Sequence, residues 1–186
     1  MADFRHRFAD GRAVAALLLG LRRVMRRFGS LEKCFLANLG ARDETVLAAL
    51  SAMVGEIRSG PGDGCGHLLA DPSRGSACKR LNLFLRWIVR RDDVDVGVWR
   101  SVPPAKLLVP MDTHMHRLAR AIGVTRRVAV DMRSALEMTA AFRRIAPDDP
   151  VKYDFVLTRL AIAGGGELDD IFGRRGRCEA ASTGMV

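Results

Sequence analysis

Apolar residues recur at helical spacing through the first third of the chain. Over residues 13–28 they lie on one face of a predicted helix whose opposite face carries arginines. Gly29 is expected to end this helix, and Ser30 to cap a short helical segment that runs to Leu39. Asp43 precedes a third predicted helix. The apolar stripes comprise Val14, Leu17, Leu18, Leu21, Val24, Met25 and Phe28 in the first helix and Val46, Leu47, Leu50, Val54 and Ile57 in the third.

The middle of the chain combines a predicted loop with an amphipathic helix. Residues 59–75 are rich in glycine and contain two prolines, which indicates a loop. Residues 76–91 are predicted to form a helix with an apolar and a basic face. The apolar face comprises Leu81, Phe84, Leu85, Ile88 and Val89, and the basic face comprises Lys79, Arg80, Arg86, Arg90 and Arg91. A connection over residues 92–110 follows.

Three further helices are predicted, over residues 112–122, 131–145 and 150–163. The second of them is expected to bury Leu136, Met138, Phe142 and Ile145. No segment alternates polar and apolar residues for long enough to form a central strand. The sequence therefore predicts an all-α fold of about seven helices in one domain, residues 1–163, followed by a polar and flexible tail over residues 164–186.

The composition fits a globular domain. With 186 residues, 48% of them hydrophobic, the chain can bury a sizeable core and is too apolar to be a disordered basic tail. Its longest apolar run, residues 13–19, is far shorter than the roughly 18–20 residues that cross a bilayer, and no cleavage pattern follows the basic start. We therefore expect a soluble cytoplasmic protein without a membrane partner.

The net charge of +9 comes almost wholly from arginine, because only four of the 30 basic residues are lysines. Such an excess favours a polyanionic partner, and DNA in the nucleoid is the obvious one. A genome that prefers arginine to lysine would produce the same composition, so charge alone does not decide between the two.

The cysteine spacing argues against a metal centre. Cys34, Cys65, Cys78 and Cys178 form no C-x-x-C pair and have no histidine doublet at zinc spacing. They also lack the close quartet that an iron–sulfur cluster requires. We expect reduced thiols, no metal site and no cofactor.

One of the scarce lysines has a position suited to nucleophilic chemistry. Lys79 lies in the first predicted turn of the helix that follows the glycine-rich loop. The positive end of that helix and the neighbouring Arg74 and Arg80 disfavour the protonated amine, which makes a neutral nucleophile more available. The same helix start can instead hold a phosphate on its free N–H groups, and Lys79 then needs no covalent role.

A carboxylate and two histidines open the helix predicted over residues 112–122. Asp112 is expected to cap it, which stabilises by about 1 kcal/mol and requires no catalytic explanation. A capping carboxylate is also held rigidly and stays ionised, so it can steady a cation or accept a proton. His114 and His116 are two residues apart and point to different helix faces, so we expect no shared metal; one would contact DNA and the other would pack.

A third group of polar residues lies near residue 150. Asp149 and Pro150 are typical of a helix start. Lys152, Tyr153 and Asp154 place a cation, an aromatic ring and a carboxylate within one turn, a set that can line a pocket for a base. Ordinary surface and core positions would explain the same residues.

The run Asp112-Thr113-His114 with Arg117, behind a glycine-containing loop and a helix-borne lysine, resembles the helix-hairpin-helix DNA glycosylase superfamily, which includes endonuclease III and the 8-oxoguanine glycosylases. The resemblance implies that Asp112 is the catalytic aspartate and Lys79 the lysine that forms a Schiff base. The family's L-P-G-V-G hairpin pattern is replaced here by residues 72–79. The 33-residue separation of Lys79 and Asp112 is similar to that of the archaeal 8-oxoguanine glycosylases.

A closer resemblance, to a bacterial family labelled only as uncharacterised, spans residues 4–162. It rests on His6-Arg7-Phe8, Gly29-Ser30-Leu31-Glu32, Gly75-Ser76-Ala77-Cys78-Lys79-Arg80, Phe84-Leu85-Arg86-Trp87 and Asp149-Pro150-Val151-Lys152-Tyr153-Asp154-Phe155. Members of that family begin with additional helices, so this chain is expected to be short at its N-terminus and to lack part of a substrate pocket.

The resemblance, together with the basic charge, implies a monomeric base-excision repair enzyme, a DNA glycosylase with AP-lyase activity on an oxidised purine such as 8-oxoguanine in double-stranded DNA. Lys79 and Asp112 would be catalytic. The expected phosphate contacts are Arg74, Gly75, Ser76, Arg80, His114 and Arg117, and the expected pocket residues are Trp87, Lys152, Tyr153 and Asp154. The alternatives are a non-catalytic DNA-binding module on the same scaffold and, less favoured, a helical protein–protein adaptor.

Overall fold

The computed structural model describes residues 5–6, 9–60, 65 and 68–163, and the predicted tail and Cys178 lie outside them. This part of the chain is mostly helical, which confirms the all-α prediction. Its seven α-helices are α1 (Gly11–Phe28), α2 (Leu31–Leu36), α3 (Leu47–Arg58), α4 (Lys79–Val89), α5 (Thr113–Ala121), α6 (Met132–Ile145) and α7 (Asp154–Ala163). Two 3₁₀ turns, η1 (Pro72–Arg74) and η2 (Pro104–Lys106), and two antiparallel two-residue strands, β1 (Arg5–His6) and β2 (Ala9–Asp10), complete it.

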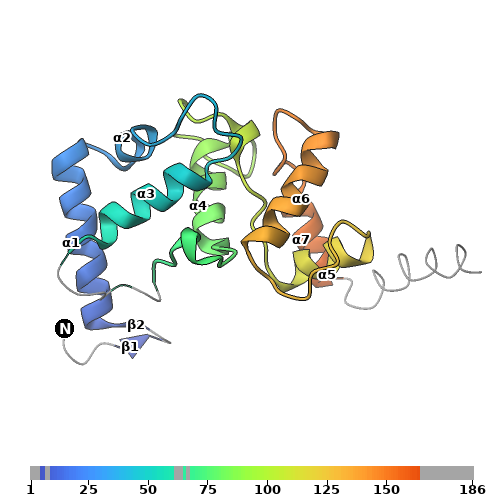
Figure 1. Ribbon diagram of the computed structural model, residues 1–186, viewed down its shortest axis with the longest axis horizontal. Coiled ribbons are helices and arrows are strands. Elements are labelled where there is room, and N and C mark those ends of the chain that lie inside the picture. The colour runs from blue at the N-terminus through green and yellow to red at the C-terminus, as the bar shows by residue number, and fades with distance from the viewer. Residues whose placement is uncertain (1–4, 7–8, 61–64, 66–67, 164–186) are drawn as a thin grey trace, which may run out of the picture.

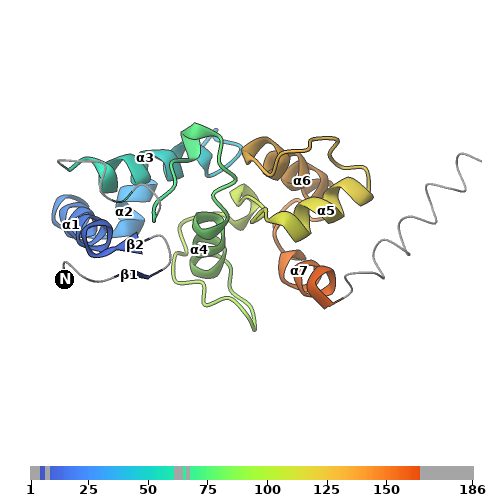
Figure 2. The same ribbon diagram turned by 90° about the horizontal axis from the view of Figure 1, so that it is seen from below.

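The helices form two groups with α4 between them (Figure 1). At the N-terminal end α1, α2 and α3 pack against one another, and at the other end α5, α6 and α7 lie together, with α5 against α7. The view turned by 90° shows the same order, with α4 separating the two groups (Figure 2). The start of α4 is therefore within reach of the C-terminal helices.

Close approach of α1 and α3 depends on a glycine. A Cβ atom added at Gly20 would lie 2.1 Å from the carbonyl oxygen of Ile57 and 2.9 Å from its Cγ2 atom. Arg23, one turn further along α1, donates from Nη2 to the same carbonyl oxygen at 3.1 Å. Only a residue without a side chain allows this contact.

One hydrophobic core connects the two helix groups. An extended segment leads from η2 to α5, and its residues Leu107, Leu108 and Val109 are almost fully buried. Its backbone is anchored on both sides, since Val46 N–H donates to the Lys106 carbonyl and Val109 N–H donates to the Thr139 hydroxyl, each at 2.9 Å. This segment sets where α5 begins.

Several predicted helix boundaries shift in the structure. The helix expected from residue 76 begins at Lys79, because residues 72–78 are occupied by η1 and a left-handed turn. The helix expected from Pro150 begins only at Asp154, after a series of turns. Asp43 does not cap α3, which starts at Leu47; its carboxylate accepts instead from Gly40 N–H at 2.8 Å. The predicted cap at Ser30 is present.

Some side chains predicted to be buried are exposed, and two predicted to be exposed are buried. Leu18, Met25 and Ile145 are 54%, 47% and 68% exposed, because the core covers a narrower stripe of α1 and α6 than their apolar positions span. Arg86 and Arg90, assigned to the basic face of α4, are buried instead, because carboxylates from distant segments pair with them.

Candidate active site

The start of α4 carries Lys79 out of an unusual turn. Cys78, the residue before it, has a φ of 46° and is the one non-glycine residue with a positive φ in the described part of the chain. Such a conformation is costly for a residue with a side chain. It is held by Ser76, whose hydroxyl accepts from Cys78 N–H at 3.3 Å, and by Asn82, whose side-chain amide donates to the Ala77 carbonyl at 3.0 Å. The backbone around Lys79 is thus firmly positioned.

The loop before this turn leans on the start of α6. Gly75 has a left-handed backbone with a φ of 83°, and its carbonyl accepts from Met132 N–H at 2.8 Å. Ser76 forms an isolated antiparallel bridge with Asp131. Arg74, at the end of η1, is exposed. The three loop residues expected to contact phosphate therefore form an exposed surface fixed to α6.

Asp112 caps α5, as the sequence predicts, and also contacts Lys79. Its Oδ1 atom accepts from Met115 N–H at 2.8 Å, and its Oδ2 atom lies 2.6 Å from Lys79 Nζ. The two residues are 33 positions apart, so tertiary structure alone makes this contact. The two expected catalytic side chains are therefore in direct hydrogen-bond contact.

The pair is charged and partly open to solvent. Burial opposes ionisation of Asp112, but the hydrogen bonds from Lys79 and Met115 and the positive charge nearby outweigh it and hold the pKa of its carboxyl below the usual value. The Lys79 side chain is 40% exposed and that of Asp112 14%. An electrophile arriving from solvent can reach the amine while the carboxylate stays behind it.

A cavity of about 200 Å³ opens beside Lys79. It is smaller than the roughly 300–1,000 Å³ of sites for drug-sized ligands, and suits a group of one or two rings. Aromatic and charged side chains line it together. The lining residues are Lys79, Leu83, Arg86, Trp87, Val94, Pro110, Asp154, Phe155, Thr158 and Arg159.

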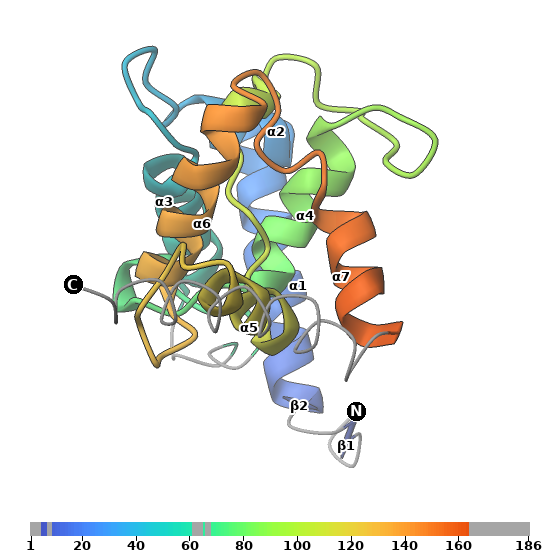
Figure 3. The ribbon, with the colours of Figure 1, turned by 90° about the vertical axis from the view of Figure 1, so that its right-hand side faces the viewer.

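Arg86 is the polar anchor of this cavity. Its Nη1 atom donates to Asp154 at 2.7 Å and its Nε atom to Asp95 at 3.1 Å, which joins α4 to α7 (Figure 3). Its Nη2 atom is buried and has no hydrogen-bond partner among the described residues. Since buried polar groups are rarely left unpaired, this donor is available to an acceptor on a ligand.

Asp154 faces the same cavity. Burial raises the pKa of its carboxyl and the charge of Asp112 adds to this, while Arg86 and Lys79 act in the opposite direction. Among the expected pocket residues, Asp154 and the half-exposed Trp87 line the cavity together with Lys79.

The other two expected pocket residues do not line this cavity. Lys152 and Tyr153 precede α7 and are exposed. The Lys152 ammonium lies 5.8 Å from the centre of the Tyr153 ring, which packs edge-on against Phe142. Asp149, predicted to cap the last helix, accepts instead from Arg90 Nε at 2.8 Å. It therefore helps to hold the turn that leads to Asp154.

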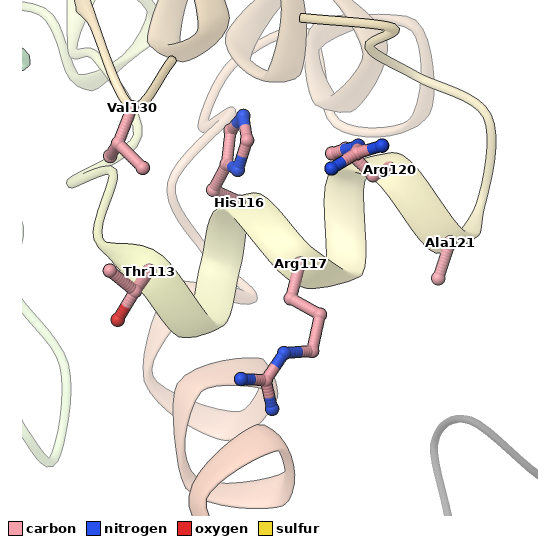
Figure 4. Close-up of a pocket in the computed structure, with 6 residues that line it drawn as sticks. All are labelled: Thr113, His116, Arg117, Arg120, Ala121 and Val130. Atoms are coloured by element: carbon pink, nitrogen blue, oxygen red, sulfur yellow. The ribbon is translucent and has the colours of Figure 1, made fainter. Parts of the chain in front are cut away.

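The remaining expected DNA contacts lie around α4 and α5. Arg80 is exposed on the first turn of α4. His114 is partly buried, and its Nδ1 atom has no hydrogen-bond partner in the described part of the chain. Arg117 is exposed and lines a separate cavity on α5 (Figure 4). His116 borders that same cavity and is almost fully buried, as expected of the packing histidine.

Three properties of the described residues bear on the expected chemistry. Cys34, Cys65 and Cys78 are free and buried. No group of three or more histidine, cysteine or acidic side chains within these ranges is arranged to hold a metal ion. None of the helices described is both long and apolar enough to span a membrane.

Comparison with known proteins identifies the family. Residues 1–163 match the family described as a protein of unknown function, DUF2400. The chain belongs to the DUF2400 family. No curated protein and no solved structure matches it. The 163 residues that match the DUF2400 family include Lys79, Asp112 and the whole lining of the cavity beside them.

Sequence reasoning missed Arg86 and Phe155 as cavity residues of this DUF2400 protein. A signal for Arg86 was present, because it follows Lys79 and Leu83 at spacings of seven and three residues, which places all three on one face of α4. The spacing does not show that Arg86 is buried on this face through its pairs with Asp95 and Asp154. Phe155 carried no comparable signal.

Proposed function

We propose that this DUF2400 protein is a DNA glycosylase with associated AP-lyase activity that removes an oxidised purine such as 8-oxoguanine from duplex DNA. The observation that carries the proposal is the 2.6 Å contact between Lys79 Nζ and Asp112 Oδ2 at the mouth of a cavity. A lysine beside an ionised carboxylate is a way to obtain an amine nucleophile and its proton acceptor together.

The proposed reaction begins with a proton transfer within this pair. Asp112 accepts a proton from the Lys79 ammonium, and the free amine attacks C1′ of the damaged nucleotide. The bond from C1′ to the base breaks, and the base leaves with the bonding electrons and is protonated. Asp112 supplies the proton that the departing base takes up and, ionised again, stabilises positive charge on the sugar.

The covalent product then allows strand cleavage. The bond between C1′ and the ring oxygen O4′ breaks, a proton moves from the Lys79 nitrogen to O4′, and an imine remains between Lys79 and C1′. Loss of a proton from C2′ and departure of the 3′-phosphate complete a β-elimination, and hydrolysis of the imine frees Lys79. Every step uses protons and water, with no oxidant or metal.

The cavity supports the proposal through its size and lining. A base rotated out of the duplex needs a pocket with a stacking surface and hydrogen-bonding groups. Trp87 and Phe155 supply aromatic faces, and the unpaired Nη2 atom of Arg86 supplies a donor to a carbonyl or ring nitrogen. The Asp154 carboxylate, on the same cavity, is an acceptor for an N–H group of the base.

Charge supports a DNA partner. The net charge of +9 and the exposed Arg74 and Arg80 near the start of α4 suit a phosphate backbone. We propose binding to duplex DNA by a single copy of the chain in the bacterial nucleoid.

Borohydride trapping tests the proposal. Duplex DNA carrying either 8-oxoguanine or a preformed abasic site is incubated with wild-type protein, Lys79→Ala and the control Lys33→Ala, whose lysine is exposed on α2. We expect a covalent adduct with wild-type protein and Lys33→Ala, and none with Lys79→Ala. An adduct on 8-oxoguanine DNA additionally requires base removal.

The opposite outcomes are equally informative. Folded wild-type protein that binds both duplexes and traps neither would refute the lyase mechanism, and release of free base would then separate a monofunctional glycosylase from a DNA-binding module. Absence of DNA binding at low salt would favour the adaptor alternative.

A further inference from the structure

A second cavity, of about 460 Å³, lies along α5, the helix that Asp112 caps. It is lined by five residues of that helix and by Val130, which precedes α6. Neither Lys79 nor Asp112 belongs to its lining. The lining residues, drawn in Figure 4, are Thr113, His116, Arg117, Arg120, Ala121 and Val130.

A buried histidine in this cavity lacks a partner. His116 is only 6% exposed, and its Nε2 atom is buried with no hydrogen-bond partner among the described residues. Leaving such a group unpaired costs on the order of 1–3 kcal/mol. A ligand that hydrogen-bonds to the imidazole would remove this cost.

Two arginines flank the histidine. Figure 4 shows His116 and Arg120 projecting from one side of α5, and Arg117 and Thr113 from the other. No hydrogen bond or ion pair joins the guanidinium group of either arginine to another described residue. None of the six lining residues is acidic. The lining therefore presents two guanidinium groups, an imidazole and a hydroxyl, and no carboxylate.

This set of donors matches the oxygens of a phosphate. Guanidinium groups bind phosphate in a bidentate manner, and charge-assisted hydrogen bonds of this kind are about twice as strong as neutral ones. We infer that the α5 cavity binds a phosphate group of the DNA backbone, through His116 and Arg120 on one side of the helix. Assignment of the phosphate to DNA, rather than to a free phosphate compound, rests on the proposed function.

The position of the cavity, on the helix that Asp112 caps, agrees with a phosphate that belongs to the DNA backbone. Along α5, which rises about 1.5 Å per residue, His116 lies about 6 Å and Arg120 about 12 Å from Asp112. Val130, on the other wall, adjoins Asp131, which bridges to Ser76 in the exposed loop before α4.

Salt-dependent binding to an undamaged duplex tests the inference. The assay is fluorescence anisotropy, in a Lys79→Ala background so that no chemistry contributes. Arg120→Gln is compared with Arg22→Gln, a matched loss of charge at an exposed site on α1, at the far end of the molecule (Figure 1). Both arginines are exposed, so the fold is expected to persist in both variants, and circular dichroism checks this.

The expected effect is the loss of one phosphate contact. Arg120→Gln makes the fall of log K with log salt shallower by about 0.9. Over a fourfold rise in salt, the affinity of this variant therefore falls about 3.5-fold less than that of the parent. Arg22→Gln leaves the slope unchanged. His116→Gln, whose fold is checked in the same way, binds the duplex more weakly than the parent.

A second arm uses inorganic phosphate alone and follows the thermal midpoint. One outcome is that phosphate raises the thermal midpoint of the parent but not of Arg120→Gln, while the two proteins have equal salt slopes on the duplex. The phosphate site is then supported, and its assignment to DNA is overturned. Equal slopes without phosphate stabilisation overturn the site itself. Neither outcome depends on borohydride trapping, so a failed lyase assay leaves this test intact, and a failed site leaves the lyase proposal intact.

Discussion

The same substitution, glycine to alanine, is expected to change stability in opposite directions at two helical positions, Gly20 and Gly55. Alanine is preferred to glycine in a helix interior by about 1 kcal/mol. At Gly55, on the exposed side of α3, a new Cβ meets no atom within 4 Å, so Gly55→Ala should gain about this amount. At Gly20 the Cβ would lie 2.1 Å from the backbone oxygen of Ile57, which cannot rotate away. Overpacking costs about 1–3 kcal/mol, and a backbone contact this close belongs at the upper end.

The net expectation for Gly20→Ala is therefore destabilisation by about 2 kcal/mol, after the gain in helix propensity is subtracted. For a chain of this size each kcal/mol shifts Tm by about 2–4 °C. Thermal unfolding followed by circular dichroism should show Gly20→Ala about 4–8 °C below wild type and Gly55→Ala about 2–4 °C above it. If Gly20→Ala matched or exceeded the wild-type Tm while Gly55→Ala behaved as expected, the close packing of α1 on α3 would be wrong.

Other predictions concern the carboxylates. Arg86→Met leaves the buried Asp154 without its cationic partner, while Asp95 keeps Arg90, and should lower the free energy of unfolding in urea by about 3–5 kcal/mol; a loss below about 1 kcal/mol would contradict the buried pairing. Asp112→Asn keeps a helix-capping acceptor, so stability should change by less than about 1 kcal/mol while the rate of borohydride-trapped adduct formation falls at least about 100-fold; an unchanged adduct rate would remove Asp112 from the mechanism. Arg127 lowers the pKa of Asp131 to about 2, so the stability that Asp131 contributes is complete above its usual value of 3.8 and is lost as pH falls toward 2. The stability difference between wild type and Asp131→Asn, measured by urea unfolding across this range, should shrink accordingly, and a difference that grew on acidification would refute the pairing.

Local features of this chain followed from the sequence because they depend on neighbouring residues. Helical periodicity predicted all seven helices, and the caps at Ser30 and Asp112 form as expected, since a cap is completed within three residues of its side chain. Lys79 and Asp112 stood out through their positions at helix starts and through a family resemblance. Their contact comes from the structure, which places Lys79 Nζ 2.6 Å from Asp112 Oδ2.

Tertiary structure decided which face of each helix is interior. Arg86 has the sequence context of a surface residue and becomes buried because Asp95 and Asp154, nine and 68 positions away, pair with it. Gly20 likewise gains its importance from Ile57 on another helix. A buried charge or a close backbone contact is stable only through partners brought from elsewhere, and neither periodicity nor composition records which partners those will be. The sequence alone therefore determined the helices and singled out Lys79 and Asp112, whereas contacts between segments distant in the chain formed the cavity walls beside them.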